Sequence, residues 1–142
     1  MLAFYDDEYQ VFNQNPLRTV HNGKPGGACE KLVFIRNGDP TNYYTNLTVS
    51  YENTLADDYG SAGSTGWSVK FLYGRRQPTE EEWDSVLAGQ SIALPDIGST
   101  LAADTFTFYP LWIRVYCPGG APAQVREGQS IKVYFDEKKV GA

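Results

Sequence analysis

Few residues of this chain have the types and spacing that catalysis requires. His21 is the only histidine, so a mechanism with an imidazole base would have to use it. It follows residues 17–20, which we expect to be a strand, and it precedes an Asn-Gly turn. Neither cysteine is near it in the sequence. We therefore interpret His21 as an ordinary turn residue and expect no catalytic residues and no enzyme activity, with a hydrolase as the least favoured class.

Acidic and glycine-rich segments are the next candidates for chemistry. Residues 57–58 (DD) and 6–8 (DDE) could gather around a calcium ion, because hard cations prefer several oxygen ligands. Consecutive acids on polar loops are far more often simply solvated, and no CxxC, HExxH or EF-hand pattern occurs. The run GSAGSTG at residues 60–66 lacks the Lys-Ser/Thr ending of a phosphate loop and precedes an expected strand. We expect no metal ion and no cofactor.

Composition is typical of a single globular domain. Of the 142 residues, 42% are hydrophobic and 20% are charged, which is close to the averages of such domains. The formal net charge of −5 would repel nucleic acid and anionic lipid. The first residues resemble no signal peptide, and no apolar stretch is long enough to span a membrane. We expect a protein made in a cytoplasm, with no nucleic-acid and no membrane partner.

Alternating apolar and polar residues recur along the chain and predict short antiparallel strands. The helix expected near residues 79–88 rests on the capping-box spacing of Thr79 and Glu82, with Gly89 at its end. About seven strands and one short helix predict an all-β fold, a single antiparallel β-sandwich of the immunoglobulin-like kind. The expected strands cover residues 17–20, 29–36, 44–52, 67–74, 92–94, 108–117 and 130–138.

Two segments fall outside this strand pattern. Residues 1–15 are expected to form an extended N-terminal arm, in which Leu2, Phe4 and Tyr5 could alternatively begin a strand, and residues 16–142 the β-sandwich domain. Residues 52–66 have no apolar periodicity and end in a Gly/Ser-rich stretch, which predicts a long exposed loop. We expect both segments to contact neighbouring chains.

Cys29 and Cys117 are expected to be free thiols. If successive strands alternate in direction, the second strand (29–36) and the sixth (108–117) run the same way. Cys29 begins its strand and Cys117 ends its own, which would place them at opposite ends of the sandwich, about 20 Å apart. A disulfide needs Cα atoms within roughly 7 Å.

Aromatic residues are the most abundant chemical resource, with ten Tyr, seven Phe and three Trp. Tyr and Arg supply large contact area and directed hydrogen bonds in protein interfaces, and exposed aromatics would serve carbohydrate binding as well. More than half of these aromatics are expected to complete the faces of the two sheets. The candidates for protein contacts are Phe4, Tyr5, Val11, Phe12, Tyr43, Tyr59, Arg75 and Arg76.

Several segments resemble small virion structural proteins of tailed bacteriophages. They are PTEEEWDSV, GQSIALPDIGST, ADTFTFYPLWIRVYCPGGAPAQVREGQS and KVYFDEKKVGA, and the resemblance spans residues 29–140. In that family a β-sandwich presents a characteristic strand followed by a Pro- and Gly-containing turn. The matching residues here are Tyr109, Pro110, Trp112, Ile113 and Arg114, then Pro118, Gly120 and Pro122.

The resemblance implies assembly rather than catalysis. The chain would be a structural subunit of the tail or baseplate, or alternatively a capsid decoration protein, assembled in the host cytoplasm and located in the virion. Its partners would be other virion proteins and copies of itself. A carbohydrate- or receptor-binding module is the alternative from another class, with a host-surface glycan as the ligand.

Overall fold

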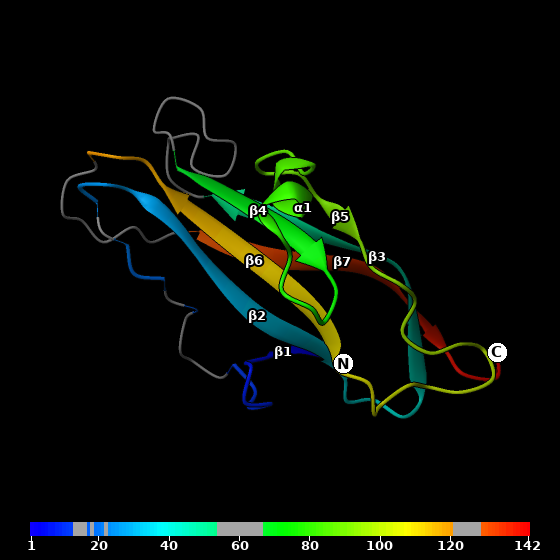
Figure 1. Ribbon diagram of the computed structural model, residues 1–142. Coiled ribbons are helices and arrows are strands. Elements are labelled where there is room, and N and C mark those ends of the chain that lie inside the picture. Colours follow the sequence, from blue (N-terminus) through cyan, green and yellow to red (C-terminus); the bar gives the residue numbers. More distant parts are fainter. Residues whose placement is uncertain (13–16, 18, 22, 54–66, 121–128) are drawn as a thin grey trace.

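Two antiparallel β-sheets face each other (Figure 1). The computed structural model describes residues 1–12, 17, 19–21, 23–53, 67–120 and 129–142. One sheet has the strand order β1-β2-β6-β4 and the other has the order β5-β3-β7. The strands are β1 Leu2–Tyr5, β2 Gly27–Asn37, β3 Asn42–Asn53, β4 Ser68–Tyr73, β5 Ile92–Ala93, β6 Tyr109–Cys117 and β7 Gln129–Lys139, and helix α1 is Glu80–Asp84.

This arrangement confirms the predicted all-β sandwich with about seven strands. An immunoglobulin constant domain has its first, second, fifth and fourth strands in one sheet and its third, sixth and seventh in the other. Here β6 pairs with β2 and β4, and β5 pairs with β3. The protein therefore shares the two-layer architecture of immunoglobulin domains but differs from them in the order of its strands.

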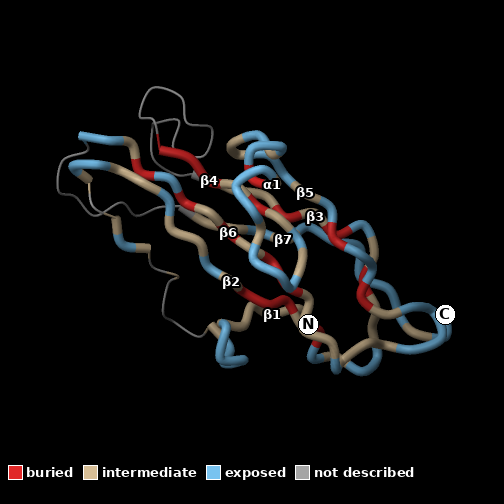
Figure 2. Tube along the Cα trace, in the orientation of Figure 1, coloured by how far each residue is buried: buried red, intermediate tan, exposed pale blue. Residues whose placement is uncertain are grey.

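The core lies between the sheets and is built from alternating strand residues (Figure 2). On β6 the apolar residues of one face are at most 8% exposed, and they are Leu111, Ile113, Val115 and Cys117. On β2, Val33 and Ile35 belong to the core while Phe34 is buried on the opposite face. An apolar sequence on both faces is typical of a central strand, and β2 lies between β1 and β6.

A β-bulge in β3 changes which residues point inward. Thr45 pairs with Asp136 and Thr48 pairs with Tyr134, so two residues of β3 stand opposite one residue of β7. Asn46 adopts a φ of 54° at this point. Unbroken alternation back from Leu47 would point Thr45 toward the core, but Tyr44 is the fully buried residue before the bulge. The extra residue shifts the inward phase by one position.

Helix α1 begins as the sequence predicted and ends earlier. The Thr79 side chain accepts a hydrogen bond from the Glu82 backbone, and the Glu82 side chain accepts one from the Thr79 backbone, which completes the capping box. The helix ends at Asp84 instead of continuing toward residue 88, because Ser85 donates from both its backbone and its side chain to the Glu82 carbonyl. Gly89 then donates to the Val69 carbonyl and ties the connection to β4.

The first strand is formed by a different segment from the one expected. Residues 2–5 were expected to lie in the arm or to begin a strand, and they pair with β2 as an edge strand of the four-stranded sheet. The predicted strand at 17–20 is not formed in its described residues 17, 19 and 20. Leu17 instead packs against the core from outside the sheets. Residues 2–5 and Leu17 are half-buried and Val20 is 90% exposed, and of the two segments only residues 2–5 pair with a sheet.

The two cysteines are free, as predicted, but the predicted reason is wrong. Strands β2 and β6 are antiparallel neighbours, with Cys29 opposite Val115 and Gly27 opposite Cys117. The thiols therefore lie at the same end of the sandwich as diagonal neighbours, a relation that separates Cα atoms by about 7–8 Å. Strict alternation of strand direction fails because the connection through α1 doubles back along β4.

Candidate protein-contact surface

Four aromatic rings gather on the outer face of the four-stranded sheet, which is the face turned away from the core. The Phe108 ring makes edge contacts with Tyr5, Tyr9 and Phe34 at centroid distances of 5.3, 4.8 and 5.8 Å. Tyr9 also stacks on Phe34, with centroids 5.0 Å apart and an interplanar angle of 21°. We call Tyr5, Tyr9, Phe34 and Phe108, with the adjoining Val11, the aromatic patch.

A tight turn after β1 positions Tyr9 on this patch. The Asp6 carboxylate accepts hydrogen bonds from the backbone of Glu8 and Gln10, both at 2.9 Å. The Asp6 and Tyr9 amides donate to the carbonyls of Gln10 and Asp6 at 2.8 and 3.0 Å. This network holds Tyr9 at a φ of 61°, in the left-handed region that bulky side chains seldom adopt. The turn therefore fixes one aromatic ring above the sheet.

A carboxylate positions the loop that carries Phe108. Asp104 accepts hydrogen bonds from the backbone amides of Phe106 and Thr107 at 3.1 and 3.0 Å, and from the Tyr109 hydroxyl at 2.8 Å. Partial burial alone would raise the pKa of Asp104, but these hydrogen bonds outweigh it and hold that pKa below its ordinary value. Burial and the bond to Asp104 raise the pKa of Tyr109. The loop is thus anchored by an ionised acid.

Two arginines attach the same loop to the sheet. The Arg36 guanidinium lies 4.7 Å from the Phe108 ring centroid and donates to the Thr105 carbonyl at 2.7 Å. Arg75 donates to the Phe108 carbonyl at 3.2 Å. Positive charge is therefore placed next to the aromatic rings.

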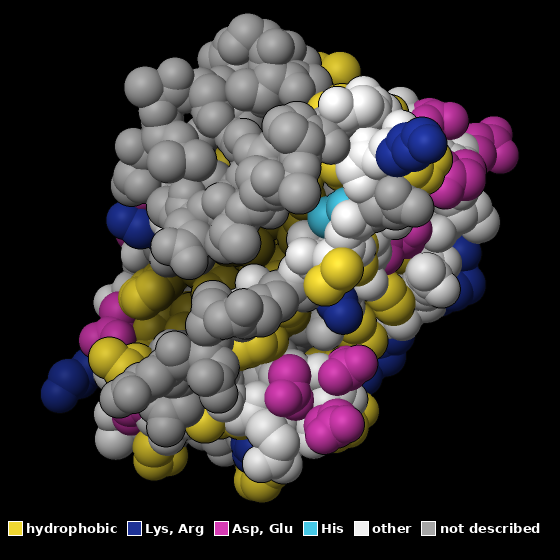
Figure 3. Space-filling model, turned by 90° about the vertical axis from the view of Figure 1, so that its left-hand side faces the viewer, with side chains coloured by type: hydrophobic (Ala, Val, Ile, Leu, Met, Phe, Trp, Pro, Cys, Tyr) yellow, Lys and Arg dark blue, Asp and Glu magenta, His cyan; other side chains and the backbone are white. Residues whose placement is uncertain are grey.

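The patch reaches solvent at several side chains. Tyr9 and Val11 are each 51% exposed, and Phe106, two residues before Phe108, is 83% exposed. On the side of the molecule shown in Figure 3, hydrophobic side chains reach the surface among acidic, basic and polar groups. Exposed aromatic and apolar groups beside arginine are the composition that protein interfaces favour.

The residues predicted for protein contacts fall into three groups. Tyr5 and Val11 belong to the aromatic patch as cross-strand neighbours, and Arg75 adjoins it. Phe4 and Phe12 instead pack against the core.

The remaining predicted contacts lie elsewhere. Tyr43 is a partly exposed residue of the other sheet, opposite Lys138, and Arg76 pairs with Glu82 beside α1 at 2.9 Å. Tyr59 lies outside the described residues, as does most of the predicted 52–66 loop.

Sequence reasoning missed Tyr9 and Phe34 as members of this surface. Phe34 carried a signal, because a strand that is apolar on both faces needs a cover on its second face. Tyr9 carried a weaker one, the Asp residue three positions before it, since Asp side chains favour local turns. Neither signal predicts that the Asp6 turn places Tyr9 over Phe34 of β2.

Other candidates for chemistry have structural partners. His21 Nδ1 lies 3.2 Å from the Gly27 carbonyl and Nε2 lies 2.9 Å from the Thr19 hydroxyl, while the ring contacts Trp67. Three or more His, Cys, Asp or Glu side chains gather nowhere in the described residues in a way that could hold a metal ion. Within the same residues, no helix has the length and apolar character to cross a bilayer.

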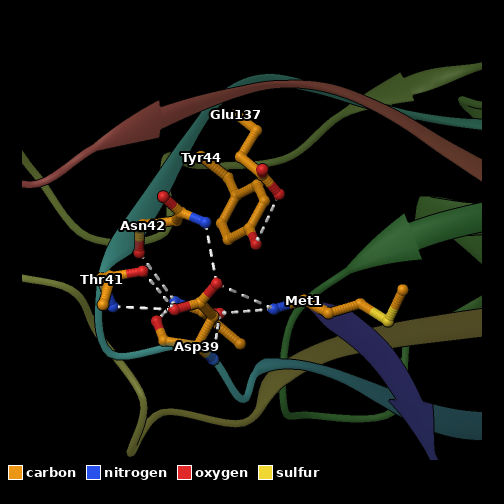
Figure 4. Close-up of polar contacts among 7 residues, drawn as sticks. Met1, Asp39, Thr41, Asn42, Tyr44 and Glu137 are labelled. Atoms are coloured by element: carbon orange, nitrogen blue, oxygen red, sulfur yellow. Dashed lines mark hydrogen bonds and ion pairs between the residues drawn. The ribbon is translucent and has the colours of Figure 1, made fainter.

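A polar network joins the turn between β2 and β3 to the N-terminus (Figure 4). Asp39 accepts from the Thr41 amide and hydroxyl at 2.8 and 2.7 Å and from the Asn42 side chain at 2.8 Å, and the Met1 α-amino group lies 3.9 Å away. The hydrogen bonds from Thr41 hold the pKa of Asp39 below its ordinary value. This carboxylate serves to close a turn.

Comparison with known proteins adds no further assignment to this surface. No protein-family model, curated protein or solved structure matches the chain.

Proposed function

We propose that this protein is a non-enzymatic structural subunit of a bacteriophage virion, in the tail or baseplate, that joins its neighbours through the aromatic patch. The observation that carries the proposal is Tyr9, a half-exposed aromatic residue held at a left-handed φ of 61°. That conformation costs about 1–2 kcal/mol for a residue with a side chain. Local strain of this kind tends to persist where a surface has a role to perform.

The surroundings of Tyr9 support a protein partner. The ring rests on Phe34 and Phe108, so its position is fixed before a partner arrives and little side-chain entropy is lost on binding. Val11 and Phe106 extend the apolar area, and Arg36 and Arg75 supply charge beside it. Capsid decoration is the alternative location for the same kind of contact.

One observation favours a second candidate function, a carbohydrate- or receptor-binding module. The Tyr9 ring stacks on Phe34 in near-parallel geometry and stays 51% exposed, which leaves aromatic surface on which a sugar ring could stack. Both functions therefore depend on the same side chain, and they differ in the ligand.

The test replaces Tyr9 with glycine. Glycine adopts a φ of 61° without strain, so Tyr9→Gly removes the ring while the turn can keep its shape. Tyr116→Ala is the matched control, because Tyr116 is 43% exposed on the same face of the sheet at the far end of β6. Each variant is produced in cells that assemble particles of the phage carrying the gene, and the amount in purified particles is measured.

We expect Tyr9→Gly to be depleted from particles at least tenfold and Tyr116→Ala to enter at the wild-type amount. Incorporation of both variants at wild-type stoichiometry would contradict the role of the patch. If the wild-type protein is absent from particles and instead binds a glycan array in a Tyr9-dependent way, the carbohydrate-binding alternative replaces the proposal.

A further inference from the structure

The two sheets of the sandwich have four edge strands, and three of them are short or covered. The chain returning from the Asp6 turn pairs with β1, where the Phe12 amide donates to the Phe4 carbonyl. The Gly89 amide donates to the Val69 carbonyl on the edge of β4. Strand β5 is only two residues long. Sheet edges protected in these ways do not pair readily with other chains.

Strand β7 differs from the other three. It is eleven residues long and pairs with β3 along one side. Among the described residues, the Ala142 amide donates to the Lys139 carbonyl at the very end of the strand, and no other backbone group outside β3 exchanges hydrogen bonds with Gln129–Lys139. Its side chains are also unusually exposed, with Tyr134 at 52% and Phe135 at 41%. A long open edge with exposed aromatics is a template for strand pairing.

The sequence of β7 is complementary to itself in one antiparallel register. When a two-fold axis passes through Tyr134, Lys132 of one copy stands opposite Asp136 of the other, and this pair occurs twice. On the same face Tyr134 meets its own copy. On the opposite face Val133 stands opposite Phe135, which pairs two apolar side chains.

Neighbouring registers lack this match. An axis through Phe135 would place Lys132 opposite Lys138, and an axis through Asp136 would place that carboxylate opposite itself. An axis through Val133 brings no opposite charges together. Like charges directly opposite each other destabilise strand pairs. The charged residues of β7 therefore disfavour these other registers and favour the one with the axis at Tyr134.

Contacts within one copy hold the outward side chains in place. Glu52 of β3 bonds to Lys132 at 2.9 Å and accepts a short hydrogen bond from the Tyr134 hydroxyl. Asn46, at the bulge of β3, donates to Asp136 at 2.6 Å. The three side chains that would meet the second copy are therefore ordered before it binds, which lowers the entropy cost of association.

We propose that β7 pairs with β7 of a second copy of this chain, antiparallel and with the two-fold axis at Tyr134. The pairing joins the two three-stranded sheets into one six-stranded sheet. The inference rests on the proposed function only for its setting, an assembly in which copies of the chain meet. Its test uses purified protein without particles, so its failure and that of the proposed function can be told apart.

The first experiment traps the two-fold contact with a disulfide. Tyr134→Cys, in a Cys29→Ser background that leaves only the buried Cys117, places a cysteine opposite its own copy. Lys138→Cys is the matched control, because it lies on the same face but about 27 Å from its copy in this register, at about 3.4 Å per residue. Under mild oxidation we expect covalent dimers of the first variant only.

The second experiment reverses charges and measures the dimer dissociation constant by sedimentation equilibrium. Lys132→Glu and Asp136→Lys should each weaken dimerisation about tenfold or more, since each variant creates two like-charge pairs. The double variant should return close to the wild-type value. Glu81→Lys on α1 is the control for net charge and should have no effect. Circular dichroism verifies that each variant is folded.

The outcomes decide the proposal. A wild-type protein that stays monomeric up to its solubility limit overturns it. So does a dimer in which Lys138→Cys is trapped as readily as Tyr134→Cys, or one in which the double charge variant is no better than the single variants, because both results exclude this register. Trapping at Tyr134 together with charge rescue supports it.

Discussion

The outer faces of the two sheets are built in opposite ways. On the four-stranded sheet, the Asp6 turn lays Tyr9 over Phe34 and helix α1 lays Trp83 against the strands, and Trp83 is fully buried there. On the three-stranded sheet, outward polar and charged residues of β3 bond to residues of β7 or to Ser91. The first face is held by packing and the second by hydrogen bonds in contact with solvent.

The two outer faces should therefore differ in how much each contributes to the free energy of unfolding. A covered face contributes to the free energy of unfolding, because apolar area is removed from water. The outer face of the three-stranded sheet is held by exposed ion pairs. It contributes little to the free energy of unfolding, since such pairs are screened by solvent and salt. The outward residues of the three-stranded sheet can therefore change with little effect on folding, which suits the pairing proposed for β7, whereas the aromatic patch lies on a face that also contributes to stability.

The largest expected effect is the loss of the tryptophan that covers the four-stranded sheet. Trp83 donates from Nε1 to Glu30 at 2.8 Å, and the Arg114 guanidinium lies 5.7 Å from its ring. Trp83→Ala should lower the free energy of unfolding by about 3–5 kcal/mol, because a fully buried ring is removed. Urea denaturation followed by circular dichroism measures it.

The matched control for this prediction is Tyr134→Ala on the outer face of the three-stranded sheet. At a protein concentration low enough to keep both proteins monomeric, it should leave the denaturation midpoint close to that of the wild type. Equal destabilisation by the two substitutions would show that the two faces are not different in the way described.

A medium effect is expected at the loop that carries Phe108. The pKa of Asp104 is lowered in the folded protein from an ordinary value of 3.8, so its contribution is present above that value and is lost as the pH falls through the folded pKa. Asp104→Asn should destabilise the protein by about 1–2 kcal/mol at pH 7, because three donors lose a charged acceptor.

The measurement is the free energy of unfolding of both proteins between pH 7 and about pH 2. The difference between wild type and Asp104→Asn should shrink as the pH falls below about 4. A difference that stays constant over this range would mean that the charge of Asp104 does not anchor the loop.

The smallest effect is expected in the three-stranded sheet and only at alkaline pH. Burial and the 3.0 Å hydrogen bond to Glu137 raise the pKa of Tyr44 from 10 to about 12. The stability tied to the protonated phenol is therefore present below pH 10 and is lost as the pH rises through about 12. Tyr44→Phe should change stability little at pH 7 and should remove this alkaline loss.

Thermal melts of the two proteins between pH 8 and 12 test this prediction. If Tyr44→Phe and wild type lose stability in parallel, the alkaline transition belongs to other groups. Tyr109 in the four-stranded sheet also has a raised pKa and contributes an alkaline loss of its own, which Tyr44→Phe should leave unchanged.

Part of the fold could be predicted because it depends on neighbours in sequence. Period-two alternation in residues 108–117 is enough to assign one face to the core, and the capping box at Thr79 and Glu82 acts within a single turn. The candidate site could be predicted only in part. Tyr5, Val11 and Arg75 were expected to make contacts, but their gathering around Phe108 depends on a loop and a turn that are far apart in the sequence.

The sequence by itself determined that this chain forms antiparallel strands with one apolar face each, because side-chain alternation is a local property of extended backbone. Tertiary structure alone decided which strands meet. The extra residue in the bulge at Asn46 points the Tyr44 side chain toward the core. The connection through α1 runs back along β4, so β2 and β6 are antiparallel neighbours and Cys29 lies near Cys117. Pairing between distant strands depends on the competition for sheet edges across the whole chain, and no local pattern encodes that competition.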